Sequence, residues 1–244
     1  MDARTGQGEN LPEDEKPLSY AELELICKSV KNENARLAAT VARLEANIDD
    51  LNNKLKIDTK TGVLTEVYFN NFHANVLEHR LKKYHESNYE QRKNVDKHLI
   101  VMIDMDGLKQ INTRYGYEAG DKALTSVATA LKTVLRSGDL LIRMNSAGDE
   151  FILIAKILPE HDSEEAKQAI SRRIHSVVQD KSDGKLSVSL GCSTLEDHDS
   201  LDQAKKEAEQ YLKDEKSALY ASQKHVPEKV VRGIFGLIKN VFDK

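Results

Sequence analysis

The sequence lacks several features that define whole classes of protein. Its 244 residues include no tryptophan, 4 prolines and 2 cysteines, and only 5% of them are aromatic. Cys27 and Cys192 lie far apart without the spacing of a metal site, so we expect reduced thiols rather than a disulfide scaffold. No apolar run approaches the ~20 residues needed to cross a bilayer, and no signal-peptide pattern precedes the first helix. These absences indicate a cytoplasmic protein.

Charge, in contrast, is abundant and nearly balanced. Charged residues make up 31% of the chain, and the formal net charge is -4. Because proteins that bind nucleic acid usually present a basic face, we expect no nucleic acid partner. The length suits one domain of ordinary size with an extension, or two small domains.

The first two segments differ sharply in pattern. Residues 1–18 are polar and aperiodic, which predicts a disordered leader. Residues 19–57 contain neither glycine nor proline, and their apolar side chains recur at heptad spacing. One heptad series is Leu23, Val30, Leu37, Leu44 and Leu51, and the other is Tyr20, Cys27, Asn34, Val41, Ile48 and Leu55.

This double series over about five heptads predicts a coiled coil. Leucine in one series with valine and isoleucine in the other favours two parallel strands, and Asn34 would fix their register. We therefore expect a homodimer joined through residues 20–57. The alternative is a single amphipathic helix packed on its own domain.

Residues 58–226 form the predicted globular domain. Its patterns predict an α/β (α+β) fold with an antiparallel hairpin at the centre of the sheet, flanked by helices. We expect strands at 98–104, 140–144, 150–157 and 185–193, and helices at 65–85, 107–115, 120–135, 163–179 and 200–223.

Residues 227–244 predict an amphipathic carboxy-terminal helix. Its apolar residues share one face and its lysines and arginine lie on the other. Such a helix suits two kinds of contact, so we expect residues 228–244 to bind either a protein partner or the surface of the inner membrane.

Four acidic residues stand at predicted junctions between strands and turns. Asp104 and Asp106 close an apolar strand, and Asp149 and Glu150 sit in the turn before another. If these strands pair, the carboxylates converge at one edge, where a hard cation such as Mg²⁺ would relieve their repulsion. The alternative is that each acid caps a helix or pairs with a surface lysine.

These motifs, taken together, resemble those of the GGDEF domain family. The segment from Asp104-Met-Asp-Gly-Leu-Lys-Gln-Ile-Asn112 to Gly120-Asp121 is similar to the family's first long motif, and Ala147-Gly-Asp-Glu-Phe151 resembles its signature with alanine in the first position. Shorter resemblances occur at 58–63, 188–191 and 218–220.

The resemblance implies a fold like the palm of nucleotidyl cyclases, and an activity. The family are bacterial diguanylate cyclases, which join two GTP molecules into cyclic di-GMP and pyrophosphate at a dimer interface with Mg²⁺ (or Mn²⁺). It implies catalytic roles for Asp104, Asp149 and Glu150, with Asp104, Asp149 and the Met105 carbonyl binding the metal. It also implies a substrate site made of Leu108, Lys109, Asn112, Asp121, Ala147 and Gly148.

The segment Arg136-Ser-Gly-Asp139 resembles the family's inhibitory product site. There an arginine and an aspartate bind the guanines of cyclic di-GMP, a role that suits the bidentate and stacking guanidinium group. The alternative is an arginine at a helix end followed by a turn aspartate.

Several departures from the family pattern bear on activity. Ala147 replaces a glycine, two extra residues lie within 144–146, and Tyr117 replaces a histidine. Gln223 stands where a phosphate-binding lysine is expected, unless Lys224 substitutes for it. The implied metal and guanine residues remain, which favours an active enzyme. The alternatives are a degenerate module that binds GTP or cyclic di-GMP and signals through a partner, and a scaffold that works through its helices.

Overall fold

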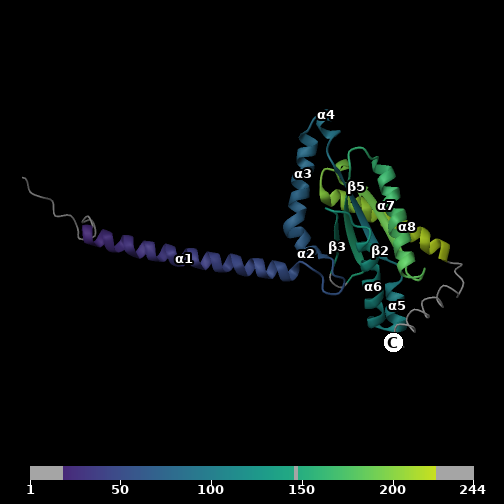
Figure 1. Ribbon diagram of the computed structural model, residues 1–244, viewed down its shortest axis with the longest axis horizontal. Coiled ribbons are helices and arrows are strands. Elements are labelled where there is room, and N and C mark those ends of the chain that lie inside the picture. Colours follow the sequence, from purple (N-terminus) through teal and green to yellow (C-terminus); the bar gives the residue numbers. More distant parts are fainter. Residues whose placement is uncertain (1–18, 146–147, 224–244) are drawn as a thin grey trace, which may run out of the picture. The chain divides into compact units, whose positions relative to one another are not determined.

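The computed structural model describes residues 19–145 and 148–223 (Figure 1). The predicted leader at 1–18 and the predicted helix at 227–244 lie outside the described residues, as do Ser146 and Ala147. The chain divides into two compact units, Met1–Leu51 and Asn52–Lys244. We describe each unit by itself.

A single long helix, α1 (Tyr20–Leu55), carries the heptads. Ser19 caps its first turn, because the Ser19 hydroxyl accepts from the Glu22 amide at 3.3 Å while the Glu22 carboxylate accepts from the Ser19 amide at 2.7 Å. Heptad side chains from Leu23 to Leu55 remain between 47% and 56% exposed. The helix therefore displays its apolar stripe on its surface.

The second unit is built on one five-stranded sheet in the order β1-β3-β4-β2-β5. Its strands are β1 (Leu64–Thr65), β2 (Lys97–Met105), β3 (Leu140–Arg143), β4 (Glu150–Ile157) and β5 (Val188–Thr194). β1 runs parallel to β3, and every other pairing is antiparallel. The predicted central hairpin, β3–β4, is present, whereas the sequence pattern does not predict β1, which overlaps the expected helix only at Thr65.

The helices of this unit are mostly those predicted. They are α2 (Glu66–Phe69), α3 (Asn75–Glu86), α4 (Tyr89–Arg92), α5 (Leu108–Tyr115), α6 (Tyr117–Lys132), α7 (Ser163–Lys181) and α8 (Leu201–Gln223), with a π-helical turn at Asn70–Ala74 and a 3-10 turn at Leu195–Asp197. The helix expected at 65–85 is present as an uninterrupted helical run over residues 66–86, formed by α2, the π-helical turn and α3. Thr65 belongs to β1 and caps α2 by accepting from the Tyr68 amide at 3.2 Å, so the helix begins later.

The sheet separates two hydrophobic cores. Leu99, Val101 and Ile103 of β2 point into one core, which also receives side chains from α5, α6 and α7. Ile100 and Met102 point into the other, which α3 and α8 cover. Figure 1 shows these helices on the two faces of the sheet. β2 lies inside the sheet between β4 and β5, so its side chains alternate between the two cores, and this alternation sets the direction of each side chain at its end.

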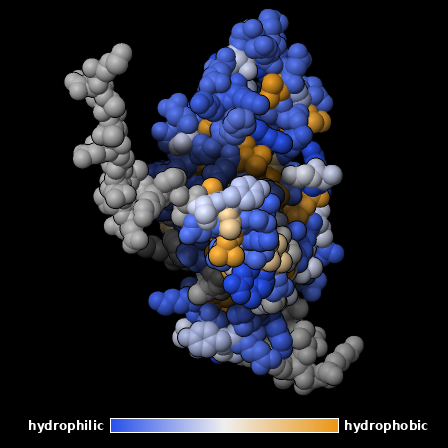
Figure 2. Space-filling view, turned by 90° about the vertical axis from the view of Figure 1, so that its left-hand side faces the viewer, coloured by the Kyte–Doolittle hydropathy of each residue, from blue (hydrophilic) through white to orange (hydrophobic). Residues whose placement is uncertain are grey.

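The surface matches the high charged fraction of the sequence. Figure 2 shows a face on which hydrophilic colours dominate and hydrophobic groups are small. In the parts of the chain described here, no helix combines the length and the apolar character that crossing a bilayer requires.

Candidate functional site

The structure brings three of the predicted acids to one end of the sheet. Asp104 lies near the end of β2, only 6% exposed, and its backbone pairs with Glu150 across the antiparallel ladder. The Met105 amide donates to the Asp149 carbonyl at 3.3 Å, which holds the turn after β3 against the end of β2. The pairing of β2 with β4 therefore places Asp104, Asp149 and Glu150 together.

The electrostatics of Asp104 reflect this crowding. Burial raises the pKa of its carboxyl group to about 6, and the negative charges of Asp149 and Glu150 add to the rise, while Lys216 opposes it. Burial and neighbouring negative charges both destabilise the ionised form of a carboxyl group, and a nearby cation stabilises that form.

Lys216 supplies such a cation in the structure. Its Nζ lies 2.6 Å from Asp104 Oδ2, and the side chain, which comes from α8, is 29% exposed. Sequence reasoning missed this residue. The helical period places Lys216 on a face of α8 but gives no sign of which strand that face meets.

The second aspartate of the strand end has a different role. Asp106 accepts from the Ser187 hydroxyl at 2.7 Å and from the Ser189 hydroxyl at 2.6 Å, so it ties the end of β2 to β5 and its approach. Gly107 then reverses the chain with a φ of 75° and leads into α5. The two aspartates of the run thus separate, and Asp104 alone joins the acidic group.

The donor set suits a metal held jointly with a nucleotide. In residues 19–145 and 148–223 no group of three or more histidine, cysteine, aspartate or glutamate side chains is arranged to hold a metal ion. Mg²⁺, however, is commonly bound by one or two carboxylates, with phosphates and water completing the shell. Asp104, Asp149 and the Met105 carbonyl fit that pattern rather than an all-protein cage.

A cavity of about 450 Å³ opens beside these acids. Leu108, Lys109 and Asn112 line it from α5, and Asp149 lines it from the signature turn. Tyr117, in the position where the family has histidine, stands at its edge and is 81% exposed. The cavity therefore offers an ammonium group, an amide and a carboxylate around one opening.

The other predicted guanine-binding residue lies on the neighbouring helix. Asp121 of α6 forms an ion pair with Lys60, at 2.5 Å between Oδ1 and Nζ. Asn112 fits closely against α6 because Gly120 has no side chain: a Cβ at Gly120 would lie 1.8 Å from Asn112 Oδ1. Gly120 thus lets α5 and α6 approach closely at Asn112. Asn112 lines the cavity, whereas Asp121 is not among the residues that line it.

A buried arginine anchors the signature turn. Arg143 donates to the Gly148 carbonyl from Nε at 3.2 Å and from Nη2 at 2.9 Å, and to Asp58 Oδ1 from Nη1 at 2.9 Å. Burial raises the pKa of Asp58, but hydrogen bonds from Thr61 and Arg143 outweigh this effect and hold the pKa below its usual range. The motif at 58–63 and the turn that carries Asp149 are therefore joined through one guanidinium group.

The extra residues before the signature are accommodated within the turn. Asn145 adopts a φ of 45°, and its carbonyl accepts from the Gly148 amide at 2.7 Å. The Met144 amide donates to the Glu150 carbonyl at 2.9 Å, which closes the turn. The longer turn still returns Glu150 opposite Asp104. Ala147 itself lies outside the described residues.

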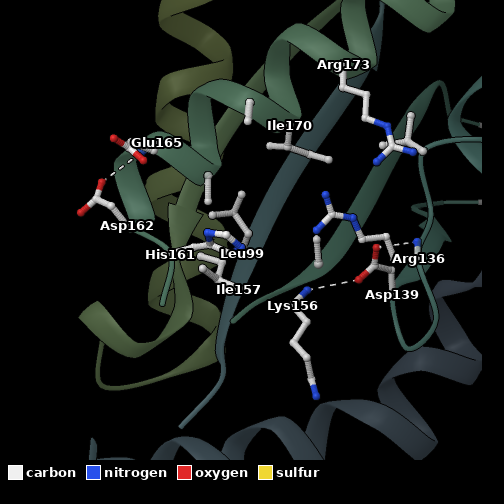
Figure 3. Close-up of a pocket in the computed structure, with 14 residues that line it drawn as sticks. Leu99, Arg136, Asp139, Lys156, Ile157, His161, Asp162, Glu165, Ile170 and Arg173 are labelled. Atoms are coloured by element: carbon white, nitrogen blue, oxygen red, sulfur yellow. Dashed lines mark hydrogen bonds between the residues drawn. The ribbon is translucent and has the colours of Figure 1, made fainter. Parts of the chain in front are cut away.

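Arg136 and Asp139 lie elsewhere, at a second cavity of about 270 Å³ (Figure 3). Asp139 stabilises the turn that contains it, because its Oδ2 accepts from the Arg136 amide at 2.8 Å. Its Oδ1 accepts from the Lys156 amide at 3.2 Å. Arg173, from α7, lines the same cavity as Arg136 (Figure 3), and its Nη2 donates to the Thr133 carbonyl at 3.3 Å. Arg173 lies in α7 with no motif around it, so its position at this cavity could not be predicted.

Several curated proteins are similar to this chain. Probable diguanylate cyclase DgcJ of Escherichia coli (strain K12) is 32% identical over 114 residues, which is 47% of this chain and 22% of that protein. Diguanylate cyclase A of Treponema denticola is 32% identical over 149 residues, 59% of this chain and 38% of that protein. Cyclic di-GMP phosphodiesterase NbdA of Pseudomonas aeruginosa is 29% identical over 145 residues, 59% of this chain and 17% of that protein. The chain thus spans less than half the length of each of these relatives.

Solved structures share the fold. A sensory box/GGDEF family protein from Caulobacter crescentus has a TM-score of 0.53 at 21% identity, covering 67% of this chain and 99% of that one. The GGDEF domain of TpbB (YfiN) from Pseudomonas aeruginosa has a TM-score of 0.52 at 25% identity, covering 66% and 89%. The coiled coil and GGDEF domain of DgcB from Caulobacter crescentus, in complex with c-di-GMP, has a TM-score of 0.50 at 17% identity, covering 80% and 95%.

The sequence model of the family described as "Diguanylate cyclase, GGDEF domain" matches residues 55–220. This match includes the whole sheet, the acids at the end of β2 and the cavity beside them. The chain belongs to the GGDEF domain family.

Proposed function

We propose that this protein is a diguanylate cyclase, which condenses two GTP molecules into cyclic di-GMP and releases pyrophosphate. The observation that carries the proposal is the convergence of Asp104, Asp149 and Glu150 beside the cavity lined by Lys109 and Asn112. Acidic groups at a strand end suit a metal-bound triphosphate, and the neighbouring polar groups suit the rest of a nucleotide.

In this proposal the acids divide the work. Asp104, Asp149 and the Met105 carbonyl hold Mg²⁺ (or Mn²⁺), while Glu150 assists loss of the proton from the attacking hydroxyl group. A bound divalent cation would neutralise charge on the phosphates during transfer. The high pKa of Asp104 follows from its burial and from its acidic neighbours.

The remaining residues bind the substrate. Lys109 contacts the terminal phosphates, and Leu108 packs beside the nucleotide. Asn112 and Asp121 bind the guanine edge, where the Asp121 carboxylate accepts from N1–H and the exocyclic amine. Adenine lacks this pair of donors and would leave the carboxylate without partners, so it binds less well. Ala147 and Gly148 let the backbone pass close to the phosphates; the role of Ala147 stays a prediction.

The reaction needs two protomers, because each holds one GTP and each 3′-hydroxyl group attacks the α-phosphorus of the other nucleotide. We propose that the heptad stripe of α1, which is about half exposed along its length, joins two copies as a parallel coiled coil. Holding both nucleotides face to face makes the attack effectively intramolecular.

The test is direct. Purified protein incubated with GTP and Mg²⁺ should form cyclic di-GMP, detected by chromatography and mass spectrometry, and the variants Asp149→Asn and Glu150→Gln should form little or none. Asp202→Asn, which changes an exposed acid on α8, is the matched control and should be active. If the folded dimer forms no cyclic di-GMP at any Mg²⁺ concentration, the proposed activity is wrong.

A second candidate, a binding module that signals through a partner, is favoured by the cavity where Arg136 and Arg173 lie together. Two guanidinium groups suit the stacked guanines and phosphates of cyclic di-GMP. Calorimetric titration with cyclic di-GMP distinguishes the two functions: binding that Arg136→Ala abolishes, in a protein that turns over no GTP, supports the module. If both binding and turnover occur, the cavity acts as the inhibitory product site of an active enzyme.

A further inference from the structure

The acidic end of the sheet already holds a cation that belongs to the chain. The Lys216 ammonium group lies 2.6 Å from Asp104 Oδ2, and the Asp104 side chain is only 8% exposed. Asp149 and Glu150 add negative charge around the same carboxylate. Lys216 therefore neutralises an acidic group that burial would otherwise destabilise.

This contact is incompatible with a divalent cation on the same oxygen. Mg²⁺ needs its oxygen ligands at about 2.0–2.1 Å in near-octahedral geometry. The ammonium group occupies the approach to Oδ2, and two cations on one carboxylate repel each other strongly in a partly buried site. Metal binding through Asp104 Oδ2 thus requires Lys216 to move.

The side chain is suited to such a movement. Lys216 projects from α8, which packs along β5 and β2, so its Cα is fixed by the fold. The flexible stem of lysine lets the ammonium group swing while the helix stays in place. An anionic triphosphate in the cavity next to Asp149 would offer the released ammonium group a new partner.

We propose that Lys216 is an internal counter-cation for Asp104, and that a divalent cation binds there only by displacing it. This inference rests on the proposed function, since it concerns the same carboxylate. It makes metal binding weak in the free protein and stronger when a nucleotide is present, because the phosphates accept the displaced lysine. By linkage, the metal strengthens nucleotide binding by the same factor.

The first experiment measures Mn²⁺ binding to the full chain without nucleotide, by titration calorimetry or by the paramagnetic signal of free Mn²⁺. Lys216→Met should bind Mn²⁺ about tenfold more tightly than the unmodified protein, because a charge-assisted hydrogen bond no longer competes. Lys213→Met is the matched control: Lys213 lies on the same helix but pairs with the exposed Glu209, so the affinity should not change.

Added GTP separates this inference from the proposed function. Mn²⁺ binding to the unmodified protein in the presence of GTP would support the metal site. If, in the same experiments without GTP, Lys216→Met binds Mn²⁺ no more tightly than Lys213→Met does, the counter-cation role of Lys216 is wrong although the metal site remains. If no form of the protein binds Mn²⁺ with or without GTP, the metal site of the proposed function is itself wrong.

A second experiment needs no variant. Amine labelling followed by mass spectrometry reports the reactivity of each lysine in the unmodified protein. Saturating Mn²⁺ should raise the labelling rate of Lys216 severalfold and leave that of Lys213 unchanged. Labelling of Lys216 that does not respond to Mn²⁺ would overturn the proposal, even if Lys216→Met failed to fold.

Discussion

Arg143 and Asp58 are 85 residues apart in the sequence but 2.9 Å apart in the structure, between Nη1 and Oδ1. Both side chains are buried, and the same guanidinium group holds the Gly148 carbonyl. The ion pair therefore joins the first motif of the domain to the turn that carries the signature acids.

Breaking this pair should destabilise the domain. Arg143→Met leaves the buried Asp58 carboxylate without its cation and with hydrogen bonds from Thr61 only, so we expect the free energy of unfolding to fall by about 3 kcal/mol. Urea denaturation measures the change. Lys206→Met, which breaks an exposed pair with Asp202, is the control and should have little effect. An equal decrease in the free energy of unfolding in the two variants would show that the buried ion pair stabilises the domain no more than an exposed one does.

The stability of the protein should depend on Asp104 between about pH 4 and pH 6. The pKa of Asp104 is about 6 in the folded protein, above its ordinary value, so the folded form keeps a proton that the unfolded chain releases. The free energy of unfolding should therefore fall as pH rises through this window and level off above it, by up to about 3 kcal/mol.

Asp104→Asn removes this titration, because asparagine stays neutral. Relative to the variant, the unmodified protein should lose stability in urea titrations as the pH rises from about 4 to about 6. Asp202→Asn controls for removing a carboxylate and should follow the unmodified protein across this range. Parallel pH profiles for Asp104→Asn and the unmodified protein would contradict the assignment.

The heptad stripe predicts a dimer that single substitutions disrupt. Leu44→Glu places a charge in the seam, so light scattering should show a shift from dimer to monomer, with loss of cyclic di-GMP formation. Ala39→Glu changes an exposed position on the opposite side of α1 and should leave the dimer intact. A Leu44→Glu protein that stays dimeric would place the interface elsewhere.

Gly120 should control recognition of the base. In Gly120→Ala the new Cβ would clash with Asn112 Oδ1, so the Asn112 side chain must move from its position in the cavity. We expect the KM for GTP to rise by about tenfold while the fold persists, as the loss of about one good hydrogen bond implies. Ser126→Ala, a change of an exposed residue on the same helix, should leave KM unaltered. An unchanged KM in Gly120→Ala would remove Asn112 from the guanine site.

Much of the fold could be predicted because its strands are short apolar runs between turns. The strand expected at 150–157 coincides with β4, and the strand expected at 98–104 lies within β2. β1 could not be predicted, since two residues show no period and their pairing with β3 depends on a contact across the chain. The helix expected at 65–85 begins one residue later, at Glu66, because Thr65 belongs to β1.

The acids of the candidate site could be located from their motifs, whereas their supporting residues could not. Asp104 and Asp149 stand at ends of apolar runs, where the sequence marks them. Arg143 lies inside a strand and Lys216 inside a helix, and both contact residues far away in the sequence. Sequence periodicity predicts which face of a helix or strand a residue occupies, but it does not predict which other element packs against that face.

The position of Asp104 near the end of β2, an internal strand of the sheet, has a consequence for the speed of cation exchange. β2 is hydrogen-bonded on both sides, so the Asp104 backbone cannot shift without opening the sheet, a movement of microseconds or longer. Lys216 reaches the carboxylate through rotatable bonds that reorient within nanoseconds. Asp104 is therefore held in place while the Lys216 side chain can move quickly. Exchange of the Lys216 ammonium group for a metal ion thus requires no rearrangement of the fold.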